Sequence, residues 1–233
     1  MIANLLKASI VSDAPRSWDK NQQPVIGIVA QGMDSDLVND PRFDGYQTYI
    51  MAAYVQFMEG SGARVVPLLS TEDWPTTEAK LSKLDGVLFP GGGNDYPEYA
   101  AGIVNYAMKM NDMGHFYPIW GTCLGFEMLA EVTANEGSDV LSYLPAHNIE
   151  LPLEFIGDPD SSKMFGDLGW RANGFAELPI TLNSHSYGIS PDKFLTDAGL
   201  SSVFKPTSIS YTPDGNVPFV ASMEGIKYPF FGT

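Results

Sequence analysis

The chain contains a single cysteine, Cys123, which lies between two glycines in the run GTCLG at 121–125. Hydrophobic residues at 116–120 predict a buried strand before it, and the run at 126–131 predicts the start of a helix after it. A nucleophile between two glycines at a strand-to-helix turn is typical of a nucleophile elbow, in which the glycines permit a tight turn. The pattern therefore predicts a cysteine nucleophile at the carboxyl end of a strand.

The predicted turn would also supply the electrostatics that thiol chemistry needs. The N-terminus of a helix carries partial positive charge and favours a thiolate over a thiol, so we expect a lowered pKa for Cys123. The backbone N–H of Leu124 would be placed to stabilise an oxyanion. The alternative is a small buried cysteine without chemistry, because a lone cysteine is often only that.

A second glycine-rich loop, Pro-Gly-Gly-Gly at 90–93, follows the predicted strand at 86–89. It lacks the glycine spacing of dinucleotide-binding loops, and no Walker lysine follows it. Free backbone N–H groups at Gly92 and Gly93 would suit an oxyanion hole or a substrate carboxylate. The alternative is a tight turn with no chemical role.

A cysteine hydrolase needs a base, which is usually a histidine. The chain has three histidines. We expect His115 to be exposed at the far end of the strand that leads to Cys123, and His147 to be exposed in a polar loop. His185 lies in the polar run NSHSY, and two interpretations of it stay open: a residue that faces the site, or a structural histidine, since a lone histidine is more often structural than catalytic.

Strands and helices alternate along the first half of the chain. Strands are expected at 25–30, 63–69, 86–89 and before Cys123, and helices at 46–59, 76–84 and 99–110, with Thr77 as a helix cap. Shorter strands follow at 151–156, 179–182, 208–211 and 219–222. The order predicts an α/β fold, with a mostly parallel sheet flanked by helices on both faces and a more antiparallel C-terminal part.

Composition excludes several classes of protein. Hydrophobic residues make up 44% of the 233 residues, which indicates a packed domain, and one cysteine excludes an internal disulfide framework. The formal net charge of −15 argues against a nucleic-acid partner, and no stretch is apolar enough to span a membrane. We expect residues 1–23 to be a poorly ordered lead-in, since they make a weak secretory signal.

Five segments together resemble the gamma-glutamyl hydrolases of the class I glutamine amidotransferase superfamily. The segments are PVIGI at 24–28, GARVVP at 62–67, GVLFPGG at 86–92, PIWGTCLGFE at 118–127 and MEGIKYP at 223–229. They follow the order of the family and place its domain at 24–233. Enzymes of this family cleave gamma-glutamyl links of folate polyglutamates by a thiol mechanism.

The resemblance implies roles for particular residues. Cys123 would be the nucleophile, Leu124 and Gly92 would supply oxyanion N–H groups, and His185 matches a family histidine near the substrate. Gly93 and Glu127 would belong to the same oxyanion and substrate-binding site. The family uses no metal or organic cofactor, and its substrate is a small molecule.

The resemblance also bears on where the protein acts. The family is typically lysosomal, vacuolar or secreted. This N-terminus carries no convincing signal peptide, which leaves the cytosol open as well.

The chain departs from the family at its end. The family continues into a His-Pro-Glu segment that completes a catalytic triad, whereas this sequence stops at YPFFGT, residues 228–233. We therefore expect the final segment of the fold to be missing and the activity to be impaired. A sheet face left exposed there would favour self-association, so a homodimer is one expected assembly.

Two other functions remain open at this point. One is a glutaminase unit that delivers ammonia to a synthase partner, since it would share the elbow and the glycine loop. The other is a catalytically dead protein that binds polyglutamate without cleaving it.

Overall fold

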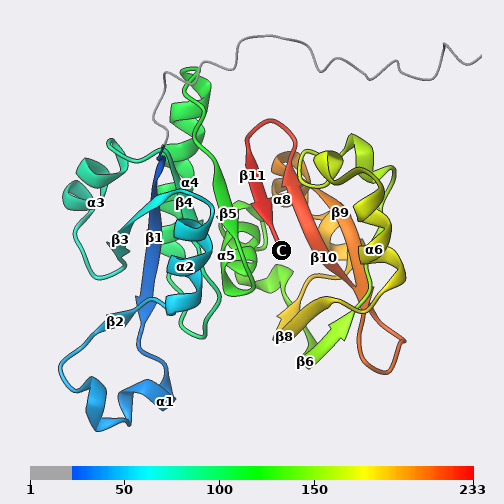
Figure 1. Ribbon diagram of the computed structural model, residues 1–233, viewed down its shortest axis with the longest axis horizontal. Coiled ribbons are helices and arrows are strands. Elements are labelled where there is room, and N and C mark those ends of the chain that lie inside the picture. The colour runs from blue at the N-terminus through cyan, green and yellow to red at the C-terminus, as the bar shows by residue number, and fades with distance from the viewer. Residues whose placement is uncertain (1–22) are drawn as a thin grey trace, which may run out of the picture.

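The computed structural model describes residues 23–233, and a nine-stranded sheet forms the centre of this part of the chain. Its strands run in the order β2-β1-β4-β5-β11-β10-β9-β7, and β3 also pairs with β1, along Val25–Ala30 (Figure 1). The parallel half comprises β1 (Val25–Gly32), β3 (Arg64–Leu69), β4 (Gly86–Phe89) and β5 (Ile119–Gly121). The predicted strands of this half are therefore confirmed.

Helices cover both faces of the parallel strands, as predicted. They are α2 (Ala52–Gly60), α3 (Trp74–Leu81), α4 (Pro97–Asp112) and α5 (Leu124–Thr133). In Figure 1, α2 lies in front of the sheet, to the right of β1, whereas α4 lies behind the strands. The main core lies between the sheet and α4 and α5, where buried residues such as Val87, Ile103, Ile119 and Leu129 pack together. Burial of such side chains is the main stabilising contribution to the fold.

The C-terminal part of the sheet is antiparallel, which confirms the predicted change of pattern. It comprises β7 (Glu154–Phe155), β9 (Phe204–Tyr211), β10 (Pro218–Gly225) and β11 (Phe230–Gly232). Strand β11 is parallel to β5, so it joins this part to the parallel half. A separate two-stranded sheet pairs β6 (Ser142–Leu151) with β8 (Thr181–Gly188).

Short elements complete the described chain. They are α1 (Ser35–Val38), β2 (Thr48–Tyr49), α6 (Ala172–Glu177), α7 (Pro191–Thr196), α8 (Ala198–Val203) and the 3-10 turns η1 (Pro41–Phe43), η2 (Gly137–Val140), η3 (Pro159–Ser161) and η4 (Gly166–Arg171). Within the described residues, no helix has the length and apolar character needed to cross a membrane. The expected lead-in at 1–23 lies outside the described residues, except for its last residue.

Several predicted boundaries are wrong. The expected helix at 46–59 begins only at Ala52, because Thr48 and Tyr49 pair with the end of β1. Thr77 does not cap α3; the carboxylate of Asp73 does so by accepting the N–H of Thr76 at 2.9 Å. His147 lies in β6 rather than in a loop, and only Glu154 and Phe155 of the expected strand at 151–156 form β7.

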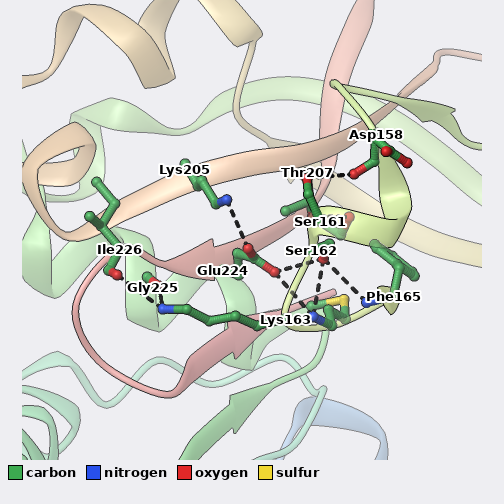
Figure 2. A network of polar contacts seen from close by, with 12 residues as sticks. Asp158, Ser161, Ser162, Lys163, Phe165, Lys205, Thr207, Glu224, Gly225 and Ile226 are labelled. Carbon is green, nitrogen blue, oxygen red and sulfur yellow. Dashed lines mark hydrogen bonds and ion pairs between the residues drawn. The ribbon is translucent and has the colours of Figure 1, made fainter. Parts of the chain in front are cut away.

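A buried carboxylate fixes the turn between β10 and β11 (Figure 2). The Glu224 side chain is fully buried, and it accepts hydrogen bonds from Ser162 Oγ at 2.7 Å and from the N–H of Met164 at 3.1 Å. Lys205 Nζ lies 3.0 Å from its other oxygen. The ammonium of Lys163 donates to the carbonyl oxygens of Gly225 and Ile226 in the turn itself. The chain around η3 is thereby tied to the hairpin that carries β11.

Candidate active site

Cys123 lies at the turn between β5 and α5 in a strained backbone conformation. Its φ is 55° and its ψ is −113°, a region that side chains rarely occupy outside functional turns. Hydrogen bonds hold the turn on three sides: Thr122 N–H donates to the Phe89 carbonyl at 3.0 Å, and Cys123 N–H donates to the Thr233 carbonyl at 2.8 Å. Thr233 N–H donates in turn to the Gly121 carbonyl at 2.9 Å. The predicted strand-to-helix elbow is therefore present.

Two backbone N–H groups approach the sulfur of Cys123. They belong to Leu124, the first residue of α5, and to Gly92, in the loop after β4, and both lower the pKa of the thiol. Burial and the charge of Glu127 act more strongly in the other direction, so the pKa is raised overall. The expectation of a lowered pKa is therefore wrong, because it considered the helix terminus and not the burial that the fold imposes.

The glycine loop after β4 is held by two side chains from other elements. Gly91 N–H donates to the hydroxyl of Tyr54, on α2, at 2.8 Å. The carbonyl of Gly91 accepts a hydrogen bond of 2.6 Å from the carboxamide of Gln31, at the end of β1. Gly92 and Gly93 are both exposed. A Cβ atom on Gly93 would border open space, whereas one on Gly92 would meet the carboxamide of Gln31, and the N–H of Gly92 acts on the cysteine.

A cavity of about 240 Å³ opens beside the thiol. Its wall includes Cys123, Glu127 and His185 together with aromatic side chains from several elements. These aromatic residues are Phe126, Phe165, Phe175, Tyr187 and Phe219. The combination of a mostly apolar wall and a few polar groups is typical of sites that bind small molecules.

His185, on β8, is half-buried at this cavity. Its ring meets the ring of Phe219 edge to face, with 4.9 Å between the centroids. Its Nδ1 is buried and has no hydrogen-bond partner among the described residues. Burial lowers the pKa of the imidazole, which favours the neutral form that can accept a proton.

Glu127 projects from the first turn of α5 into the same cavity. Burial and the nearby carboxylates of Asp95 and Glu131 raise its pKa to about 7. A carboxyl group with this pKa exchanges its proton near neutral pH. The acidic surroundings of the thiol therefore include one group whose charge changes in the physiological range.

The structure brings together most of the residues that the sequence singles out. Leu124 and Gly92 meet at the sulfur of Cys123, and Glu127 and His185 share its cavity. His115 and His147 are exposed, as expected. Among residues 23–233, no group of three or more histidine, cysteine or acidic side chains is arranged to hold a metal ion.

Sequence reasoning missed the residues that support the site from a distance. Gln31 and Tyr54 hold the glycine loop, and Phe165 and Phe175 contribute to the cavity wall. Only Gln31 carried a signal, since it is a polar residue directly after the apolar run at 25–30.

Solved structures with the same fold come from the class I glutamine amidotransferase group. A putative GMP synthase protein from Thermoplasma acidophilum matches 91% of this chain and 82% of its own with a TM-score of 0.53 and 17% identity. The glutaminase domain of Trypanosoma brucei CTPS, solved with bound acivicin, matches 91% of this chain and 84% of its own with a TM-score of 0.57 and 14% identity. The protein therefore has a class I glutamine amidotransferase-like fold.

Sequence similarity narrows this class. Residues 24–138 match the Peptidase C26 family. Gamma-glutamyl hydrolases from Homo sapiens and Rattus norvegicus are 32% and 33% identical over 92% and 91% of this chain, which covers 67% and 66% of their lengths. Gamma-glutamyl hydrolase B from Dictyostelium discoideum is 34% identical over 91% of this chain and 61% of its own length. The chain belongs to the gamma-glutamyl hydrolase family and spans about two thirds of the length of these relatives.

Proposed function

We propose that the protein is a cysteine-dependent hydrolase that cleaves gamma-glutamyl bonds of folate polyglutamates. The observation that carries the proposal is the thiol of Cys123, which faces the N–H groups of Leu124 and Gly92 at the mouth of a cavity. The substrate class comes from the gamma-glutamyl hydrolases that the chain resembles.

The proposed reaction begins with attack of the Cys123 thiolate on the carbonyl carbon of the gamma-amide. The carbonyl oxygen becomes an oxyanion, which the N–H groups of Leu124 and Gly92 stabilise. The C–N bond then breaks, the departing amine takes up a proton, and a thioester remains on Cys123. Water attacks the thioester, releases the gamma-carboxylate and restores the thiol.

A neighbouring group must accept the thiol proton, because the pKa of Cys123 is raised. Glu127 and His185 line the cavity, and each has a pKa that permits exchange near or below neutral pH. Separate Glu127→Gln and His185→Gln variants test which of the two accepts the proton. The acceptor is the residue whose loss lowers kcat and removes the acidic limb of the pH–rate profile.

The first experiment measures glutamate release from a pteroyl-polyglutamate, with Cys123→Ala as the matched control. We expect turnover in the wild-type chain and a loss of roughly 10⁴-fold or more in the control. Ammonia release from glutamine with no cleavage of the polyglutamate would replace the proposal with a glutaminase. Polyglutamate binding without turnover would replace it with a binding protein.

A further inference from the structure

The side chain of Gln31 is fully buried at the end of β1, directly behind the glycine loop. Its Nε2 lies 2.6 Å from the carbonyl oxygen of Gly91, a residue 60 positions further along the chain. Because a carbonyl oxygen can only accept a hydrogen bond, the nitrogen of the carboxamide must face it. The contact therefore fixes both the carboxamide of Gln31 and the direction of the Gly91 carbonyl.

The direction of this carbonyl determines where the next N–H points. The carbonyl of Gly91 and the N–H of Gly92 belong to one peptide group, which is planar, and no peptide bond in the described chain is cis. In a trans peptide the two groups point in opposite directions. A carbonyl turned toward Gln31 therefore turns the Gly92 N–H away from Gln31 and toward the sulfur of Cys123, where it lowers the thiol pKa.

Close packing on both sides leaves this peptide little freedom. A Cβ atom on Gly92 would lie 1.7 Å from Oε1 of Gln31, so the carboxamide lies directly against the glycine backbone. A Cβ atom on Gly91 would lie 3.1 Å from the Cβ of Cys123 and 2.7 Å from the hydroxyl of Tyr54. Tyr54 holds the preceding peptide through the N–H of Gly91.

We propose that Gln31 is a positioning residue that orients the Gly91–Gly92 peptide and thereby aims the Gly92 N–H at the reacting atoms. The expected effect of Gln31 on turnover rests on the proposed function, because the oxyanion forms only in that reaction. A Gly92 N–H that points elsewhere would stabilise the oxyanion less well. Its effect on the thiol does not depend on turnover, since the same N–H stabilises the resting thiolate. Gln31 itself acts only through the peptide.

The test compares the wild-type chain with Gln31→Met, which keeps the length of the side chain and removes the donor. The rate of Cys123 alkylation by iodoacetamide is measured against pH, and kcat and KM are measured with a pteroyl-polyglutamate. We expect the alkylation profile to move to higher pH by roughly half a unit or more. We also expect kcat to fall about 10- to 100-fold while KM changes less than about threefold.

Asn111→Leu is the matched control for the loss of a structural amide. The carboxamide of Asn111 donates to the carbonyl oxygens of Ala107 and Tyr117, both at 2.8 Å, and neither residue lines the cavity of Cys123. We expect this variant to lose stability in urea unfolding and to keep the wild-type alkylation profile and kcat. A shift in Gln31→Met that Asn111→Leu does not show supports the positioning role.

An unchanged alkylation profile in folded Gln31→Met would overturn the inference, and so would an equal shift in Asn111→Leu. If Gln31→Met does not fold, the same measurements are made on Gln31→Leu. A shifted alkylation profile then supports the inference, and an unchanged profile overturns it. A wild-type chain without turnover would contradict the proposed function alone. The alkylation profiles would then still decide whether Gln31 aims the N–H of Gly92.

Discussion

A Cβ atom on Gly125 would lie 2.1 Å from the carbonyl oxygen of Phe89. The first turn of α5 therefore packs directly on the end of β4, backbone against backbone. Gly121 is under a similar constraint, since its Cβ would lie 2.4 Å from the carbonyl oxygen of Gly125. Neither glycine has a positive φ; the positive φ of the elbow falls on Cys123. The two glycines thus permit the close approach of α5 to the strands, and the backbone strain falls on Cys123.

Gly125→Ala is therefore expected to disrupt the elbow. The nearest atoms belong to backbone and cannot rotate away, so we expect a loss of about 2–3 kcal/mol in the free energy of unfolding. Cys123 alkylation should also change, because Gly125 lies in the turn that holds the sulfur. Urea unfolding and iodoacetamide labelling measure the two effects.

Gly60→Ala is the control for this substitution, since the Cβ position of Gly60 borders open space and its φ is not positive. We expect its stability to remain within about 0.5 kcal/mol of wild type. If Gly125→Ala were as stable as the wild type, α5 and β4 would not be packed as closely as described.

Glu127→Gln is expected to make Cys123 more reactive. The charge of Glu127 raises the pKa of the thiol, so its removal should lower that pKa and speed alkylation near pH 7. Glu78→Gln, on the exposed surface of α3, removes an equal charge away from the cavity and should leave the rate unchanged. A rate in Glu127→Gln equal to that of Glu78→Gln would contradict the electrostatic coupling.

The same carboxyl group should make stability depend on pH. The pKa of Glu127 is about 7 in the folded protein, against an ordinary value of 4.5. Between these values the folded state holds more protons than the unfolded state, so stability should fall as pH rises from 4.5 to 7. In urea unfolding between pH 4.5 and 7, the free energy of unfolding should fall less in Glu127→Gln than in the wild type. An identical fall in the two proteins would contradict the raised pKa of Glu127.

The sequence predicts the parts of the fold whose signals are local. The run at 25–30 is apolar and rich in β-branched residues, and the strand at 86–89 is apolar and ends at a glycine-rich loop, so both are recognisable as buried strands. The elbow is recognisable because its glycines flank the cysteine within five positions. Strand β2 has no such signal, since Thr48 and Tyr49 are extended only because they pair with the end of β1.

The supporting part of the site depends on distant contacts and could not be predicted in this way. Gln31 and Tyr54 reach Gly91 across 60 and 37 positions of the chain, and no local pattern records such pairs. The raised pKa of Cys123 has the same origin, because burial is produced by elements that assemble around the elbow. The sequence therefore singled out Cys123, whereas the fold was needed to determine the direction of its pKa shift and the side chains that support its turn.

His185 is expected to titrate below the ordinary histidine value of 6.5, because burial lowers its pKa. Below pH 6.5 the unfolded state then takes up more protons than the folded state, so stability should fall as pH decreases. A proton–nitrogen NMR titration measures the pKa directly, and His185→Gln identifies the signal. A pKa at or above 6.5 would mean that the imidazole is not buried as described.

Glu224→Gln is expected to destabilise the protein at neutral pH. Burial alone would raise the pKa of Glu224, but hydrogen bonds from Ser162, Lys205 and the Met164 N–H outweigh it and lower the pKa. The ionised carboxylate is therefore the form that the network in Figure 2 stabilises. Its loss should cost about 2–4 kcal/mol in urea unfolding at pH 7, since the amide leaves Lys205 unpaired and presents a donor where an acceptor is needed.

The pH dependence of this variant separates the charge from the shape of the side chain. Because the folded pKa lies below the ordinary 4.5, the stabilisation is present above pH 4.5 and is lost as pH falls through the folded value. The stability difference between wild type and Glu224→Gln should therefore narrow on acidification. Glu177→Gln, at the exposed end of α6, should match wild type at every pH. If the difference in free energy of unfolding between wild type and Glu224→Gln stays constant down to pH 3, the network stabilises the protein through packing and not through charge.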